Sequence, residues 1–169
     1  DLIDILYEKW GTFSSFQRTR GVLRMLAGVV EDLYKSERNI DLILPGDIPL
    51  LNSEVREEFI KHIGREYESV IGSDIAGHEA KAGALDTANR EWKRLAGRIA
   101  TTIFFHSFSA DDPEKGTGLP YIKLSTLRSN EYPAQVTDIL QRLSLALWYL
   151  NNRGEIYYFS RIPNLNRMI

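Results

Sequence analysis

The chain has 169 residues, of which 43% are hydrophobic and 26% charged, and its formal net charge is −2. These values are ordinary for a globular protein and predict one domain or two small ones. The chain has no cysteine, which excludes disulfides and thiolate metal sites and fits a cytoplasmic location. No apolar run approaches the roughly 18–20 residues that span a bilayer, so we expect no membrane partner. Because the chain starts at Asp1 rather than Met, we expect it to be a piece of a longer protein.

The first forty residues predict two helices. A short one, rich in apolar residues, runs from Leu2 to Trp10 and ends at Gly11. From Gln17 to about Ser36, apolar residues recur at spacings of three and four, which indicates an amphipathic helix packed on a core. The apolar positions of this helix are Val22, Leu23, Leu26, Val29, Val30, Leu33 and Tyr34.

The middle of the chain predicts a connector and two further helices. Residues 39–52 contain two prolines and a glycine between short β-leaning runs, so we expect an ordered connector with a short strand at 42–44. Ser53 is a candidate N-cap for a helix that ends near Gly72. The apolar spacing then predicts one long helix over about 78–107.

The last segment predicts a winged helix. After the polar loop 108–118, we expect a strand at 121–123, a brief helix at 125–128, a helix over about 133–150, a turn at 151–154 and a strand at 155–159. The fold class is therefore mainly α with a small β-hairpin. Its expected parts are helices over 1–38, a connector and helical segment over 39–84, and a winged-helix-like domain over 85–169. An irregular helical bundle with one hairpin is the alternative.

Three arginines, Arg18, Arg20 and Arg24, cluster where the second helix begins. Positive charge at a helix N-terminus opposes the helix dipole, and like charges four residues apart repel by a few tenths of a kcal/mol. Both costs vanish if an anion such as phosphate binds there, because free backbone N–H groups and guanidinium groups then point at it. The alternative is that these side chains are solvated or meet carboxylates such as Glu31 or Asp32.

Two apparent catalytic motifs are incomplete. Residues 72–77 have the glycine spacing of a phosphate-binding loop, but His78 and Glu79 stand where Lys and Ser/Thr are needed. His78 and Glu79 also begin a zinc-protease motif, in which Ala82 replaces the second histidine. We interpret 72–77 as a turn between helices, and we expect neither a metal site nor a complete active site.

The last fifty residues are weakly basic, with six Lys/Arg against three Asp/Glu. The helix over 133–150 is apolar on most sides, whereas a base-reading helix presents polar side chains to the groove. We therefore expect weak nonspecific nucleic-acid contact or docking of a protein. The candidates for phosphate contact are Lys123, Arg128, Arg142, Arg153, Arg161 and Arg167.

A family resemblance rests on FQRTRGVLRMLA, with LIDILYEKWG before it and DLILPGDIPL after it, and on TDILQRLSLALWYL, EIYYFS and PNLN near the end. The sequence resembles the C-terminal part of the predicted AAA+-superfamily ATPases of archaea and bacteria, catalogued as domain of unknown function number 499. In AAA+ proteins a helical lid follows the nucleotide domain, and a lid arginine, called sensor 2, reaches the terminal phosphate. The matching position here is Arg20, with Arg18 as the fallback. Arg24 is then expected at a subunit surface or bound to a carboxylate.

The resemblance implies a lid and winged-helix module that couples ATP hydrolysis to the movement or docking of a nucleic-acid or protein partner. ATP and Mg²⁺ would bind the full-length protein, with none expected on this fragment, because the phosphate loop would lie upstream. The expected partners are the upstream part of the ATPase chain and further copies in a homo-oligomer. The alternative function is a non-enzymatic winged-helix module that binds DNA or a partner protein.

Overall fold

The computed structural model describes residues 2–16, 18–36, 40–109 and 115–164. In these ranges the protein is mainly helical, with a small three-stranded antiparallel sheet near the C-terminus. The helices are α1 (Leu2–Asp4), α2 (Arg18–Lys35), α3 (Ser53–Ile63), α4 (Tyr67–Val70), α5 (Lys81–Ala88), α6 (Leu95–Ser107), α7 (Leu119–Thr126) and α8 (Pro133–Ala146). The strands are β1 (Thr117–Gly118), β2 (Leu150–Arg153) and β3 (Ile156–Phe159).

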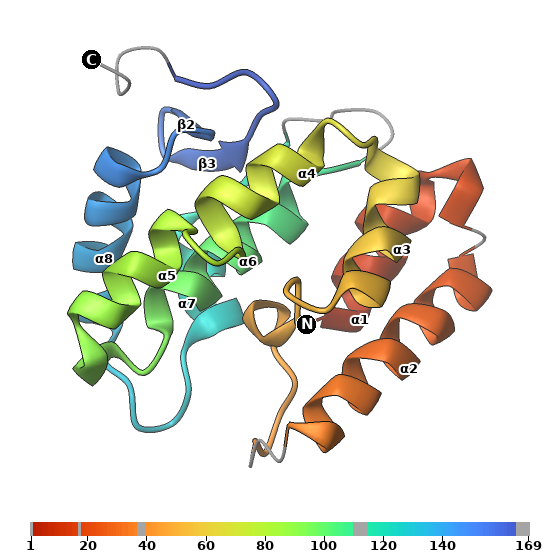
Figure 1. The fold of residues 1–169 in the computed structure, drawn as a ribbon, viewed down its shortest axis with the longest axis horizontal. Coiled ribbons are helices and arrows are strands. Elements are labelled where there is room, and N and C mark those ends of the chain that lie inside the picture. The colour runs from red at the N-terminus through yellow and green to blue at the C-terminus, as the bar shows by residue number, and fades with distance from the viewer. Residues whose placement is uncertain (1, 17, 37–39, 110–114, 165–169) are drawn as a thin grey trace.

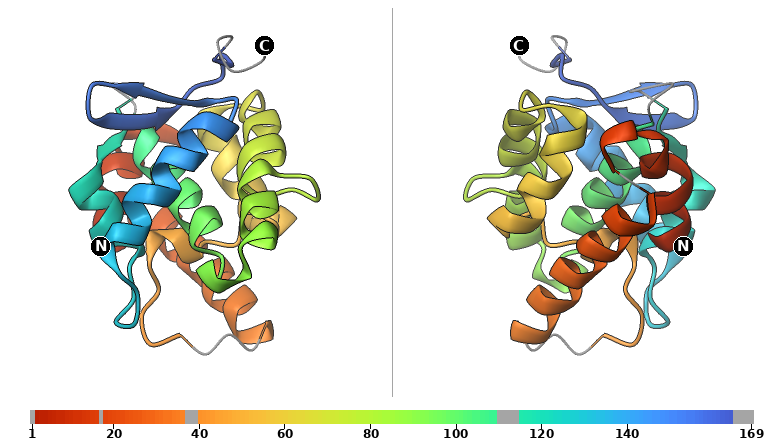
Figure 2. Two further views of the ribbon diagram at one scale, coloured as in Figure 1. Left: turned by 90° about the vertical axis from the view of Figure 1, so that its left-hand side faces the viewer. Right: turned by 90° about the vertical axis from the view of Figure 1, so that its right-hand side faces the viewer.

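Helix α6 is the centre of the fold. It contacts α5, α7, α8, β3 and the turn Pro45–Asp47. Figure 1 shows α2 and α3 at one end of the molecule and α8 with the hairpin at the other, and Figure 2 shows the hairpin closing one side. Because α6 is surrounded, twelve of its residues are buried, including polar Thr102 and Ser107. The connector approaches so closely that a Cβ on Gly46 would lie 2.7 Å from the carbonyl oxygen of Arg98.

One hydrophobic core runs from Leu2 to Phe159 and joins the three predicted parts of the chain. Its aromatic centre lies where the N-terminal helices meet α6. The Trp10 ring is fully buried, 4.9 Å from the Phe59 ring and 5.6 Å from the Phe105 ring, and its indole N–H donates to the Phe105 carbonyl at 3.1 Å. These contacts fix the N-terminal helices, and with them α2, against α6.

Lys9, beside Trp10, makes a second connection to α6. Its ammonium lies 3.0 Å from Nδ1 of His106, 2.9 Å from the His106 carbonyl oxygen and 3.3 Å from that of Gly116. Burial, helped by the charge of Lys115, lowers the pKa of Lys9 to about 8. Burial, helped by the charge of Lys9, lowers the pKa of His106 to about 3. His106 is therefore neutral at pH 7, and its Nδ1 accepts a hydrogen bond from Lys9.

The C-terminal elements run in the order helix, strand, two helices and hairpin, as predicted, but the strand before α7 is 117–118, in the predicted loop, and not 121–123. The sheet order is β1-β3-β2, with both pairs antiparallel. The predicted hairpin is confirmed, but its turn is shorter than expected, since Asn151–Arg153 belong to β2 and only Gly154 and Glu155 connect the strands. Gly154 has φ +62°, the conformation that a two-residue hairpin turn requires at its first position.

Several other boundaries differ from the prediction. Residues 42–44 form no strand, and residues 121–123 lie inside α7. The helix after the connector is capped by Asn52, whose side chain accepts from the N–H groups of Glu54 and Val55, and it breaks at Gly64, where φ is +107°. A side chain that reaches two free N–H groups replaces the predicted cap at Ser53.

The predicted long helix is two helices, α5 and α6, at an angle to each other (Figure 1). Between them lies a turn in which Lys93 (φ 49°) and Arg94 (φ 66°) are both in the left-handed region. Such a conformation costs a non-glycine residue about 1 kcal/mol. The sequence did not predict this break, because the apolar spacing continues through residues 89–94 and none of these residues is glycine or proline.

Candidate functional site

Arg20 lies in the first turn of α2 and is exposed. Within the described residues its guanidinium has no hydrogen-bond or ion-pair partner. It lines a cavity of about 380 Å³ between the start of α2 and the end of α3, whose other lining residues are Ser15, Gly21, Arg24, Glu58, Lys61 and His62. The side chain of Arg18, the fallback position, lies outside the described part of the structure.

Glu58 is the carboxylate of this cavity, and two cations already neutralise it. It lies 3.2 Å from Arg24 and 2.8 Å from Lys61. Burial alone would raise the pKa of Glu58, but the hydrogen bonds from Lys61 and Arg24 outweigh burial and lower it. The expectation that Arg24 binds a carboxylate is thus confirmed, and Arg20 is the guanidinium that stays available.

His62 completes the wall of the cavity. Its Nδ1 lies 2.8 Å from the Ser15 hydroxyl, which joins the loop before α2 to the end of α3. Burial lowers the pKa of His62. The charge of Glu58 raises this pKa, whereas the charges of Lys61 and Arg24 lower it further. The cavity therefore presents the guanidinium of Arg20, in the first turn of α2, beside an imidazole whose pKa is lowered. This arrangement suits an anion.

The residues predicted for nucleic-acid contact lie on different elements and are mostly occupied. Ion pairs join Arg128 to Asp47, Arg142 to Asp138 at 3.2 Å, and Arg161 to Glu66 at 3.5 Å. Arg153 lies over the Tyr158 ring at 5.8 Å, Lys123 is half-buried in α7, and Arg167 lies outside the described residues. Phosphate contact by these residues stays a prediction.

The glycine-rich stretch 72–77 has a structural role. Asp74 is fully buried, and its carboxylate accepts hydrogen bonds from the backbone N–H groups of Trp148 (3.1 Å) and Tyr149 (2.7 Å). These bonds fix the corner between α8 and β2 to the helical turn Ile71–Ile75. Among the described residues no three His, Asp or Glu side chains are grouped to hold a metal ion, and no helix is long and apolar enough to cross a membrane.

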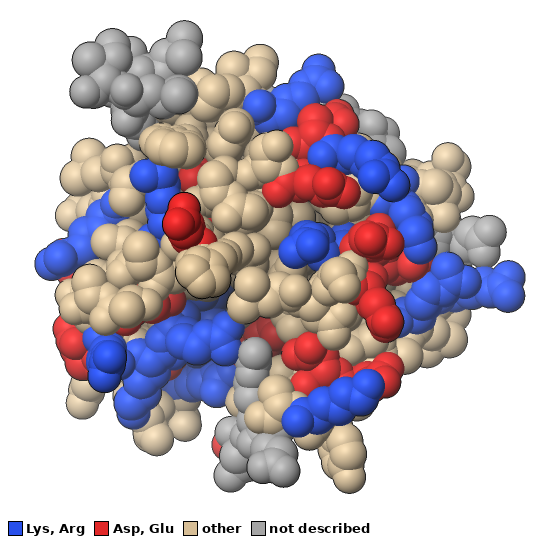
Figure 3. Space-filling model, viewed as in Figure 1, with Lys and Arg blue, Asp and Glu red and all other residues tan. Residues whose placement is uncertain are grey.

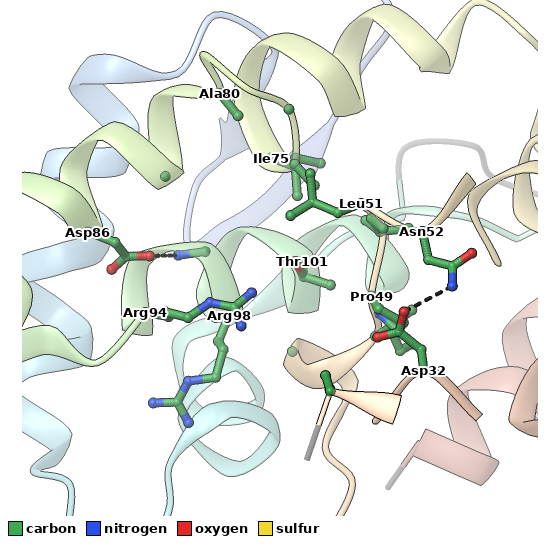
Figure 4. Close-up of a pocket in the computed structure, with 18 of the residues that line it drawn as sticks. Asp32, Pro49, Leu51, Asn52, Ile75, Ala80, Asp86, Arg94, Arg98 and Thr101 are labelled. Atoms are coloured by element: carbon green, nitrogen blue, oxygen red, sulfur yellow. Dashed lines mark hydrogen bonds between the residues drawn. The ribbon is translucent and has the colours of Figure 1, made fainter. Parts of the chain in front are cut away.

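A larger cleft, which sequence reasoning missed, lies between α5, the start of α6 and the segment 48–52. Its volume is about 690 Å³. Figure 4 shows Asp86, Arg94 and Arg98 on one side, and Pro49, Leu51, Asn52 and Asp32 on the other. On the face in Figure 3, Lys and Arg side chains gather at the lower left, over the turn between α5 and α6. That turn contributes Arg90, Lys93 and Arg94 to the cleft.

Two charged groups of the cleft are held by the fold. The Asp86 carboxylate accepts from the N–H groups of Ala96 (3.0 Å) and Gly97 (2.8 Å) and so caps α6. Burial raises the pKa of Asp86 although these backbone bonds favour its charged form. Arg98 donates to the Thr126 carbonyl and pairs with Glu131. Arg90 and Lys93, in contrast, have no ion pair with any described residue.

Comparison with known protein families gives a match over most of the chain. The model of the DUF499 second domain matches residues 2–159, nearly the whole chain. The chain belongs to the DUF499 family. The resemblance to the family numbered 499 is thereby confirmed. No curated protein and no solved structure matches the DUF499 domain described here.

Proposed function

We propose that this DUF499 domain is the lid and winged-helix part of a cytoplasmic AAA+-type ATPase, in which Arg20 contacts the terminal phosphate of ATP. The observation that carries the proposal is the difference between the two exposed arginines of α2. Arg24 is paired with Glu58, whereas Arg20 has no partner among the described residues and lies in the first turn of an 18-residue helix. A phosphate there would remove the charge repulsion that the sequence leaves in place.

The proposed active site is shared between two parts of the longer protein. The phosphate loop and the Mg²⁺-binding carboxylate would come from the upstream part, and this domain would add Arg20. An arginine so placed stabilises charge on the transferring phosphoryl group and responds to its loss after cleavage. Since Trp10 and Lys9 fix the N-terminal helices to α6, movement at Arg20 would be transmitted to the C-terminal elements.

The order α6, β1, α7, α8, β2 and β3, with the sheet order β1-β3-β2, supports a winged helix as the C-terminal module. Its helix α8 exposes Leu145 (80% exposed), and its one arginine is paired with Asp138. An apolar, charge-neutral face suits a protein partner better than a nucleic acid. We therefore propose that this module docks a protein, either another part of the ATPase or the partner it moves.

The test compares Arg20→Ala with Arg65→Ala in the longer protein. Removal of a transition-state arginine lowers turnover by roughly 10³-fold or more in related phosphoryl-transfer sites. We expect Arg20→Ala to lose at least about 100-fold in ATP turnover, given the part that Mg²⁺ plays in stabilising the same charge. Arg65 is exposed and lies outside the cavity, so its replacement should leave turnover unchanged. Unchanged turnover and nucleotide affinity in Arg20→Ala would refute the proposal.

A further inference from the structure

The cleft between α5 and the segment 48–52 has a wall of cationic side chains that the proposed ATPase function does not use. Arg90, Lys93 and Arg94 reach it from a single short turn. Glu91 lies in the same turn but does not line the cleft, and Asp86 is occupied as the cap of α6. Three neighbouring cations repel one another, and a bound anion would reverse that cost.

The backbone of this turn gives a second, independent reason to look for a ligand. Lys93 and Arg94 are consecutive non-glycine residues with positive φ. Glycine adopts this conformation without strain, so two glycines at these positions would make the turn more stable. The chain instead keeps two cationic side chains there at a cost in stability, and strained residues of this kind are concentrated at functional sites.

The opposite walls leave room for more than an ion. The volume of about 690 Å³ lies within the range of small-molecule sites, about 300–1,000 Å³. On α5 the cleft is lined by small residues, and a Cβ on Gly83 would meet no atom within 4 Å. A glycine inside a helix costs about 1 kcal/mol of stability relative to alanine. Gly83 therefore keeps this wall open although it destabilises α5. Leu51 (62% exposed) and Pro49 provide apolar surface across the cleft.

We propose that this cleft binds a small organic phosphate. The phosphate group lies on Arg90, Lys93 and Arg94, and the organic part lies between Gly83 on α5 and the apolar surface of Pro49 and Leu51. A phosphate carries close to two negative charges at pH 7. It therefore matches Arg90 and Lys93, which have no ion pair with any described residue, better than a carboxylate does. The paired side chains of Asn52 and Asp32, 2.9 Å apart, are polar groups at the far end of the ligand. The site shares no lining residue with the Arg20 cavity.

Titration of the ¹⁵N-labelled 169-residue chain with phenyl phosphate and with inorganic phosphate tests this proposal. We expect both to shift the backbone amide signals of residues 93–97, with phenyl phosphate binding at least about fivefold more tightly because its ring contacts the apolar wall. The double variant Lys93→Gly with Arg94→Gly should weaken binding at least about tenfold. Its melting temperature should be unchanged or higher, since glycine relieves the positive φ.

Two further variants separate a binding site from a general charge effect. Gly83→Leu fills the cleft without removing a charge, and it should weaken phenyl phosphate binding more than inorganic phosphate binding. Arg65→Ala removes a cation elsewhere and should leave both affinities unchanged.

Three results would overturn the proposal. The first is the absence of any shift at residues 93–97 at ligand concentrations up to about 10 mM. Binding would then be weaker than the millimolar affinity of a minimal site. The second is that phosphate shifts residues 20–24 instead. The third is that oligodeoxythymidine of about 20 nucleotides binds this face while phenyl phosphate does not, which would assign the cations to a nucleic-acid backbone.

Discussion

Replacing Trp10 with alanine is expected to remove about 3–5 kcal/mol from the free energy of unfolding. The indole is fully buried, lies edge-on to Phe59 and Phe108, and donates a hydrogen bond to the Phe105 carbonyl. Its loss leaves a cavity at the junction of the N-terminal helices with α6, together with an unpaired buried carbonyl oxygen. Urea denaturation followed by circular dichroism measures the change.

Two matched variants separate the causes. Trp10→Phe retains most of the ring volume but not the N–H donor, so it should cost about 1–3 kcal/mol. Tyr34→Ala removes an aromatic side chain that is 85% exposed on α2, and its effect should stay within about 0.5 kcal/mol. A loss below about 1 kcal/mol in Trp10→Ala would mean that the N-terminal helices contribute little to the stability of the remainder.

The second large effect is acid destabilisation through His106. Burial lowers its pKa from 6.5 to about 3 in the folded chain, so between these pH values the unfolded chain binds more protons. Stability from this group is complete above pH 6.5 and is lost as pH falls toward 3. The slope approaches about 1.4 kcal/mol per pH unit, and the total is on the order of several kcal/mol.

His106→Asn isolates this contribution, because the amide oxygen can still accept the hydrogen bond from Lys9 but does not titrate. We expect the variant to lose less stability than the natural chain between pH 6.5 and 4. The exposed His78→Asn serves as the control and should follow the natural chain. Equal pH slopes for His106→Asn and the natural chain would contradict the assignment of a neutral, buried imidazole.

Lys9 makes the stability of the chain depend on pH in the alkaline range. Its pKa falls from 10.5 to about 8, so the unfolded chain again binds more protons between these values, and stability should rise with pH there.

Sequence reasoning found the features that depend on periodicity and order. The 3.6-residue period predicted α2. The proline and turn residues after the loop 108–118 predicted α8 and the hairpin. Periodicity could not tell which apolar stripe of α2 would be covered. Val22, Met25, Val29 and Leu33 are buried, whereas Leu23, Val30 and Tyr34 are exposed, and the choice depends on where residues 5–12 and α3 pack. Those contacts join residues far apart in the chain.

The candidate sites show the same division. The cluster of arginines at the start of α2 was visible in the sequence, but the partner that distinguishes Arg24 from Arg20 is Glu58, thirty-four residues away from Arg24. The cleft was missed because α5 and α6 read as one helix. Its cations take their position from the left-handed turn at Lys93 and Arg94, and only Asn89, a poor helix residue, marked the break.

The most direct measurement is the affinity of the longer protein for ATP and for ADP, with and without Arg20. A contact with the terminal phosphate exists only in the ATP complex, and a charge-assisted hydrogen bond contributes about 1.5–3 kcal/mol. We predict that Arg20→Ala weakens ATP binding roughly 10- to 100-fold and leaves ADP binding unchanged, while Arg65→Ala changes neither. Equal weakening of both nucleotides, or of neither, would contradict the proposed contact between Arg20 and the terminal phosphate.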